Sequence, residues 1–235
     1  PGGCAIGSRP VNLHLDCMKK LGAEVFTEGG YIKAKAEKGL KGAEILFDTI
    51  SVTGTENAIM AAVLAEGKTI IKNAAREPEV GDLIDCLSRM GAKIQGKGTK
   101  EIIIFGVKEL KPTSYNVMPD RIETATYLTA VTMTGGEISI KNTMPKTLDS
   151  VLKKLSEAGA KIKIEDDVIN LKMDRDINPV DISTAPYPLF PTDMQAQFIS
   201  LNTIAKGQST VIETIFENRF MHVQELVRMG GDISL

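Results

Sequence analysis

An internal repeat of about 70 residues limits the folds open to this sequence more than any other feature. A short motif occurs four times, with an apolar residue, a glycine, a small residue and then a β-favouring residue near its end. We call its glycines the marker glycines; they are Gly22, Gly91, Gly159 and Gly230. Their spacings are 69, 68 and 71 residues. A glycine between an apolar helical stripe and a strand is typical of a helix C-cap.

The segments around the marker glycines predict a repeating order of helices and strands. Before Gly91, the residues Val80, Leu83, Ile84 and Leu87 follow the i, i+3, i+4, i+7 spacing of an amphipathic helix. Further helices are expected over 53–66, 121–133 and 194–205. Strands are expected over 44–50, 101–107, 137–141, 168–172 and 209–214. The unit is strand, helix, strand, helix, strand, strand, which indicates an α/β fold.

The chain holds the tail of one unit, two whole units and most of another, so we expect a piece of a longer protein. Its 235 residues are 43% hydrophobic, as in a globular protein. The longest apolar run, 58–65, is too short to cross a bilayer, which needs about 20 residues. The net charge of −2 does not favour binding to nucleic acid or to a membrane. Three cysteines favour a reducing compartment.

Two copies of the repeat break its apolar pattern. Eight residues before each marker glycine the sequence has His14, Leu83, Val151 and His222, so both histidines occupy one repeat position. Eleven residues before, it has Val11, Val80, Leu148 and Arg219. Positions where a sequence departs from its own pattern are often functional. The alternative is a half-exposed polar helix end.

The first ten residues form a glycine-rich segment that contains Cys4 and Arg9. Backbone N–H groups of glycines approach anions closely, and the forked donors of an arginine bind phosphate or carboxylate. A thiol in such a loop can act as an acid or a nucleophile. The alternative is a flexible loop with an inert thiol. Cys17 and Cys86 lie in helical segments, where buried packing is expected.

Two later segments carry further candidates. In the segment 190–195, Asp193 is a candidate general base, although Thr192 or Asp193 could simply cap the next helix. In the segment 216–222, Arg219 is a candidate carboxylate ligand, although it could form a solvated ion pair with Glu217. The sequence contains no phosphate-binding loop, no dinucleotide fingerprint and no CxxC pair, so we expect no metal and no cofactor.

Five motifs together resemble the UDP-N-acetylglucosamine 1-carboxyvinyltransferase family of enolpyruvyl transferases. They are Pro1–Cys4 with Arg9–Pro10, Asn73–Pro78, Asp120–Thr124, Phe190–Gln195 and Glu217–His222. The resemblance implies an inside-out α/β barrel fold with two similar domains, each built from three units and both incomplete here. It places residues 1–117 in the first domain and residues 118–235 in the second.

The resemblance also implies a reaction. The enolpyruvyl group of phosphoenolpyruvate moves to the 3-hydroxyl of UDP-N-acetylglucosamine, and phosphate leaves. In the family this is the first committed step of peptidoglycan synthesis, and it takes place in the cytoplasm. The implied partners are these two substrates, with no nucleic acid, no membrane and no cofactor.

Roles for individual residues follow from the motifs by resemblance. Cys4 matches the proton-donating cysteine that fosfomycin modifies, and Asp193 matches the base for the sugar hydroxyl. Arg9 matches a ligand of the phosphate of phosphoenolpyruvate, and Arg219 a ligand of its carboxylate. Ile215 resembles a sugar contact. The uridine and diphosphate contacts are expected at Arg9, Pro10, Val11, Asn12 and Leu13 and at Thr49, Ile50, Ser51 and Val52.

The sequence departs from the family pattern at two positions. Asn12 stands where the family often has Asp, and Thr49 stands where some members have Lys. The family's Lys-Asn pair and further arginines lie outside this sequence, so we expect the chain alone to be inactive. Alternatives are transfer to shikimate 3-phosphate and a noncatalytic nucleotide-sugar-binding role. A cysteine hydrolase lacks a base for Cys4.

Overall fold

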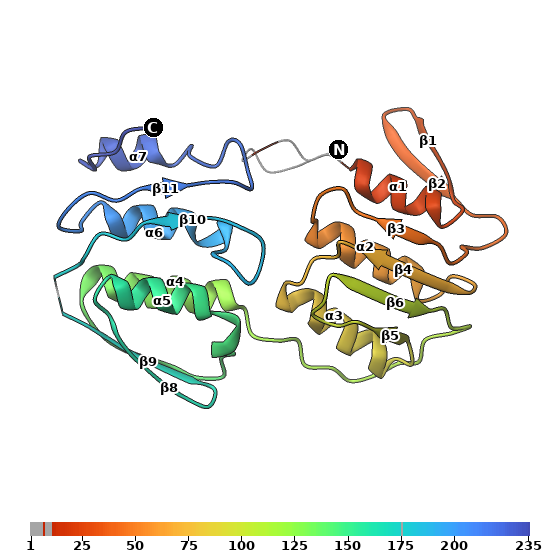
Figure 1. Ribbon diagram of the computed structural model, residues 1–235, viewed down its shortest axis with the longest axis horizontal. Coiled ribbons are helices and arrows are strands. Elements are labelled where there is room, and N and C mark those ends of the chain that lie inside the picture. Colours follow the sequence, from red (N-terminus) through yellow and green to blue (C-terminus); the bar gives the residue numbers. More distant parts are fainter. Residues whose placement is uncertain (1–6, 8–10, 175) are drawn as a thin grey trace. The chain divides into compact units, whose positions relative to one another are not determined.

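A computed structural model of the protein describes residue 7, residues 11–174 and residues 176–235. The chain divides into two compact units, and the division falls between Val117 and Met118 (Figure 1). Each unit has its own hydrophobic core of buried side chains. Within the described ranges, none of the helices is long and apolar enough to cross a membrane.

The first unit contains one complete copy of the repeat. Its elements are α1 (Asn12–Lys20), β1 (Glu24–Glu28), β2 (Tyr31–Lys35), β3 (Glu44–Leu46), α2 (Val52–Ala62), β4 (Lys68–Lys72), α3 (Pro78–Arg89), β5 (Lys93–Gln95) and β6 (Glu101–Phe105). From β3 to β6 they follow the predicted order of strand, helix, strand, helix, strand, strand. The sheet order is β3-β4-β6-β5, in which β3 and β4 are parallel and the other pairs are antiparallel.

The core of the first unit forms where the helices cover one face of this sheet. Ile71 on β4 and Ile102 and Ile104 on β6 are buried, while alternate residues of both strands turn outward. Val80 and Ile84 of α3 lie in the same cluster. Burial of one such side chain stabilises the fold by about 1.5–3 kcal/mol. The predicted amphipathic stripe is therefore confirmed as the core face of α3.

The second unit contains the next two copies. Counting the complete copy of the first unit as the first copy, we call these the second and third copies. Its elements are α4 (Arg121–Thr134), β7 (Gly136–Ile140), η1 (Pro145–Thr147), α5 (Asp149–Glu157), β8 (Lys161–Glu165), β9 (Val168–Met173), β10 (Ile182–Ser183), η2 (Thr192–Met194), α6 (Gln195–Asn202), β11 (Val211–Ile212) and α7 (Val223–Arg228), where η is a 3₁₀ helix. Strands β7, β9 and β8 form an antiparallel sheet, and β10 pairs in parallel with β11. Phe190 and Phe198 meet edge to face in the core, with 4.9 Å between ring centroids.

The marker glycines adopt the backbone conformation that their position predicts. Their φ angles are 93°, 103°, 111° and 99° at Gly22, Gly91, Gly159 and Gly230. A Cβ atom is disfavoured in this left-handed region, which is why glycine ends these helices. The C-cap prediction is thus confirmed at all four marker glycines.

The predicted boundaries differ from the structure in several places. The residues 106–120, ahead of α4, contain no assigned strand, so the second copy lacks its first element. The expectation of two whole copies of the repeat is therefore wrong. Pro112 and Pro119 in this segment lack the N–H that a ladder requires. The predicted strand at 209–214 is reduced to β11, and the helix predicted to Glu66 ends at Ala62. Among the described residues, none of the sheets closes into a barrel.

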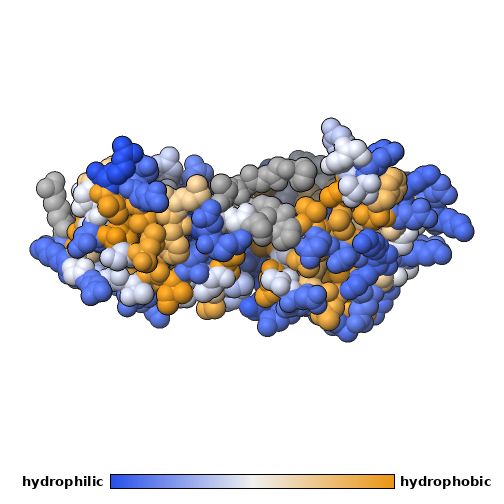
Figure 2. Space-filling model, turned by 90° about the horizontal axis from the view of Figure 1, so that it is seen from above, coloured by the Kyte–Doolittle hydropathy of each residue, from blue (hydrophilic) through white to orange (hydrophobic). Residues whose placement is uncertain are grey.

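The surface of each unit mixes hydrophilic and hydrophobic side chains. In the view of Figure 2, blue and orange residues alternate over short distances within each unit. The β1–β2 hairpin is part of this mixed surface, because Phe26, Tyr31 and Ile32 are exposed on it. Strand β2 has the same position in the repeat as β6. Whereas β6 pairs with a strand on each side, β2 pairs with β1 alone among the described residues.

Candidate active site

Asp193 and Arg219 form an ion pair in the second unit. Arg219 Nη2 lies 2.9 Å from Asp193 Oδ1, and Arg219 Nη1 donates to Thr192 Oγ1 at 3.0 Å. Asp193 follows β10 in the chain and Arg219 follows β11, and because these strands are parallel their carboxyl ends lie at the same edge. The arginine side chain is 18% exposed and the aspartate 53% exposed. The guanidinium also lies 5.4 Å from the ring of Phe216.

The alternative interpretation of this segment as a helix cap is wrong. Ser51 caps α2 by accepting from the N–H of Gly54, and Asp120 caps α4 by accepting from two N–H groups. Neither η2 nor α6 has a side-chain cap. Thr192 and Asp193 instead bind Arg219. In the third copy, these two residues therefore bind Arg219 instead of capping the helix that follows.

Glu213 contacts Thr192, which in turn binds Arg219. Glu213 was not singled out from the sequence. Its Oε2 accepts from Thr192 Oγ1 at 2.9 Å, and its Oε1 accepts from Thr184 Oγ1 at 2.8 Å. The backbone N–H of Ile215 also donates to Oε1, at 2.8 Å. Ile215, the expected sugar contact, is thus on the same loop as Glu213, with its side chain 37% exposed. The repeat offered a signal for Glu213, because it stands six residues after Gly207, where the other copies have asparagine.

The two histidines at the irregular repeat position lie in different settings. The Nε2 atom of His222 is buried and has no hydrogen-bond partner among the residues that the structure describes. Burial lowers the pKa of His222, and the positive charge of Arg219 lowers it further. Asn57 Nδ2 lies 2.8 Å from His14 Nδ1, which joins α2 to α1. The polar residues therefore mark positions next to candidate residues in both units.

The candidate nucleotide contacts of the first unit lie at two adjacent helix starts. Asn12 and Leu13 open α1, directly after Val11, and Val52 opens α2 after Thr49, Ile50 and Ser51. The two helices pack together, and a bond joins His14 in the first turn of α1 to Asn57 in the middle of α2. Val11, Asn12 and Thr49 are exposed, whereas Leu13, Ile50, Ser51 and Val52 are half-buried. Cys4, Arg9 and Pro10 lie outside the described residues.

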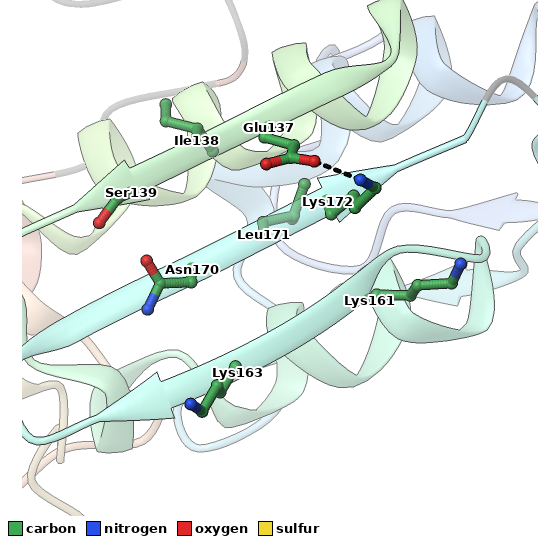
Figure 3. Close-up of a pocket in the computed structure, with 8 residues that line it drawn as sticks. All are labelled: Glu137, Ile138, Ser139, Lys161, Lys163, Asn170, Leu171 and Lys172. Carbon is green, nitrogen blue, oxygen red and sulfur yellow. Dashed lines mark hydrogen bonds and ion pairs between the residues drawn. The ribbon is translucent and has the colours of Figure 1, made fainter.

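A shallow pocket of about 300 Å³ lies elsewhere, on the face of the β7–β9–β8 sheet (Figure 3). It contains none of the candidate residues, and its lining includes three lysines. Lys172 is paired with Glu137, Lys161 with Asp174 and Lys163 with Glu165. Exposed pairs of this kind leave little net charge for a ligand.

The remaining titratable groups give no metal centre. Within the ranges 11–174 and 176–235, no three His, Cys, Asp or Glu side chains are grouped as a metal site requires. Cys17 is buried, as expected from its helical position, while Cys86 is half-buried.

Comparison with known proteins agrees with the repeat and the motifs. A family model described as EPSP synthase (3-phosphoshikimate 1-carboxyvinyltransferase) matches residues 1–235. The chain is 60% identical over 236 residues to a UDP-N-acetylglucosamine 1-carboxyvinyltransferase of Aeromonas hydrophila subsp. hydrophila. That match covers 100% of this chain and 56% of the relative, so the chain spans little more than half of the relative's length.

Solved structures share the fold at low sequence identity. The enolpyruvyl transferase NikO from Streptomyces tendae superposes with a TM-score of 0.86 at 21% identity, over 97% of this chain and 57% of that one. An EPSP synthase from Acinetobacter baumannii gives a TM-score of 0.67 at 16% identity, over 98% of this chain and 55% of that one. The predicted α/β fold of the enolpyruvyl transferases is thereby confirmed. Because the family model extends over all 235 residues, the chain belongs to the EPSP synthase family.

Proposed function

We propose that this chain is part of a transferase that moves the enolpyruvyl group of phosphoenolpyruvate to the 3-hydroxyl of UDP-N-acetylglucosamine. The observation that carries the proposal is the pairing of Asp193 with Arg219 on motifs that match this family. The relative with 60% identity bears the name of this activity. The chain spans 56% of that relative, so the activity is proposed for the full-length protein, meaning this chain within the length of its relatives.

The Asp193–Arg219 pair suits a reaction between an anion and a hydroxyl group. Arg219 offers a forked donor to the carboxylate of phosphoenolpyruvate, which competes with Asp193 for the guanidinium. Once phosphoenolpyruvate holds Arg219, Asp193 is available to accept the proton of the sugar hydroxyl as its oxygen attacks C2 of phosphoenolpyruvate. The ion pair thus balances the charges of both side chains until the substrates bind.

The other candidate residues complete this proposal. A proton from the Cys4 thiol to C3 completes the addition and gives a tetrahedral ketal. Loss of a C3 proton and of phosphate then forms the enol ether. Arg9 binds the phosphate, and the exposed residues at the starts of α1 and α2 contact the uridine diphosphate. Peptidoglycan synthesis, a place in the cytoplasm and modification of Cys4 by fosfomycin follow from the same proposal.

Acceptor-dependent phosphate release tests this function. The full-length protein is incubated with phosphoenolpyruvate and either UDP-N-acetylglucosamine or shikimate 3-phosphate, the acceptor that the family model's name indicates. We expect phosphate release from phosphoenolpyruvate when UDP-N-acetylglucosamine is the acceptor and none when shikimate 3-phosphate is the acceptor. Release with shikimate 3-phosphate alone would replace the proposed acceptor, and no release from folded protein with either acceptor would contradict the enzyme function.

A further inference from the structure

Glu213 connects the buried Thr184, the arginine-binding Thr192 and the loop that follows β11. Its carboxylate accepts hydrogen bonds from the hydroxyl groups of Thr184 and Thr192 and from the backbone N–H groups of Ile215 and Phe216. The distances are between 2.8 and 3.2 Å. Thr184 is fully buried, so one end of the network is fixed in the core. A carboxylate with several hydrogen bonds of this kind is strongly held.

The bond to Glu213 determines how Thr192 meets Arg219. A threonine hydroxyl has one proton and two acceptor lone pairs. Because the proton of Thr192 goes to Glu213 Oε2, a lone pair is directed to Arg219 Nη1, which lies 3.0 Å from the oxygen. The guanidinium therefore has a fixed neighbour on one side and Asp193 on the other.

The repeat shows that this arrangement is particular to the third copy. At the position of Glu213, six residues after the corresponding glycine, the other copies have Asn73 and Asn142, both with φ of 56°. Asn73 Nδ2 donates to the carbonyl oxygen of Phe47, which ties the ends of β4 and β3 together. Glu213 does not share the left-handed backbone and instead reaches the side chains of Thr184 and Thr192. The third copy thus has an acceptor where the first has a donor.

We propose that Glu213 is a positioning residue for the transfer reaction. It holds Thr192, and through Thr192 it holds Arg219, at a fixed place relative to the loop that carries Ile215. The proposal rests on the function proposed above, and it adds a residue that touches neither substrate. Its consequence is that the ligand of the carboxylate and the contact to the sugar depend on one half-buried carboxylate.

The kinetic test compares Glu213→Gln with Glu225→Gln in the full-length protein. Glutamine keeps the size of the side chain but replaces one acceptor with a donor, so the proton of Thr192 loses its partner. We expect the KM for phosphoenolpyruvate to rise about tenfold or more, as for a lost hydrogen bond to a charged group. Glu225 is an exposed residue of α7 paired with Arg228, so its variant is expected to keep the KM of the wild type.

The KM separates positioning from a loss of folded protein, because unfolding removes active molecules without changing the KM of the remainder. A second variant, Thr192→Val, removes the same hydrogen bonds, so the double variant is expected to be little worse than the more impaired single variant. An unchanged KM in folded Glu213→Gln, or fully additive effects, would overturn the positioning role.

Crystal structures of the wild type and of Glu213→Gln decide the proposal independently of turnover. We expect Arg219 Nη1 to leave Thr192 Oγ1 in the variant while the core around Thr184 is retained. If Arg219 keeps this contact in the variant, Glu213 does not position it. Absence of phosphate release by the wild type would count against the proposed function instead, and this structural comparison would still give its own answer.

Discussion

At the scale of single residues, burial decides the chemistry of Cys17. Its side chain is 1% exposed in the core of the first unit. Burial raises the pKa of the Cys17 thiol to about 11, against a smaller lowering by Lys20. The unfolded chain releases this proton at the ordinary pKa of 9.0, before the folded chain does. The unfolded state therefore binds fewer protons between these values, and stability falls as the pH rises through this window.

We expect this loss to disappear in Cys17→Ala. The difference in free energy of unfolding between the wild type and the variant should shrink from about pH 8 to about pH 10.5, as measured by urea denaturation. Val63→Ala is the control, because it also removes a buried side chain of this core but has nothing to titrate. If the Cys17→Ala difference stays constant across this window, as the Val63→Ala difference should, the thiol is not the cause.

The sequence could name Asp193 and Arg219 but not the network that holds them. The two residues are 26 positions apart in the chain, and their contact depends on the parallel pairing of β10 with β11. Thr192 was open to interpretation as a cap because the local pattern alone resembles a helix start. Glu213 was missed because its partners, Thr184 and Thr192, are 29 and 21 residues away in the chain. The roles of Cys4, Arg9 and the other candidate residues stay predictions.

At the scale of elements, Gly91 shows why a glycine ends each marker helix. Its φ is 103°, and among the described residues no atom beyond its two chain neighbours lies within 4 Å of the position that a Cβ would take. Gly91→Ala should therefore destabilise the protein through backbone strain alone, by about 1–2 kcal/mol. The measurement is the free energy of unfolding.

Gly81→Ala is the matched control inside α3. Its φ is not in the left-handed region, and the nearest atom to a new Cβ is the flexible end of Lys97 at 3.1 Å. Alanine favours a helix by up to about 1 kcal/mol over glycine, so stability should be unchanged or higher. Equal losses in both variants would show that strain at Gly91 is not the reason for its glycine.

The cap of α4 is a second test at this scale. Asp120 accepts from the N–H groups of Ile122 and Glu123 at 2.8 and 3.1 Å. Asp120→Ala should lower the free energy of unfolding by about 1 kcal/mol. Asp232→Ala, at an exposed position outside the helices and strands, should change it by less than about 0.5 kcal/mol. A loss at Asp120 no larger than this would contradict the capping role.

Periodicity predicted the existence of the elements better than their ends. The helix expected at 121–133 is found at Arg121–Thr134, because Asp120 and Gly135 mark its limits in the sequence. The short strands β10 and β11 have only two paired residues each, so their length depends on the neighbouring strand rather than on local preference. The strand is absent ahead of α4 for a different reason, since Pro112 and Pro119 there lack the N–H that a ladder requires.

At the scale of the whole molecule, the repeat explains how one architecture carries different surfaces. The same order of elements recurs, yet the third copy places Thr192, Glu213 and Arg219 where the others have a cap, an asparagine and an apolar residue. The order of the elements could therefore be predicted from the regular copies, whereas the irregular copy pointed to Arg219 but not to Thr192 or Glu213. The assignment of the units to the two domains of the family stays a prediction.

The turnover number of Asp193→Asn in the full-length protein tests the central claim most directly. The measurement is phosphate release with saturating phosphoenolpyruvate and UDP-N-acetylglucosamine, with Asp232→Asn as the control for loss of an exposed carboxylate. Because asparagine cannot accept the hydroxyl proton, we predict that kcat falls by about 10²- to 10⁴-fold while the variant stays folded. A folded Asp193→Asn variant with the kcat of the wild type would contradict the account.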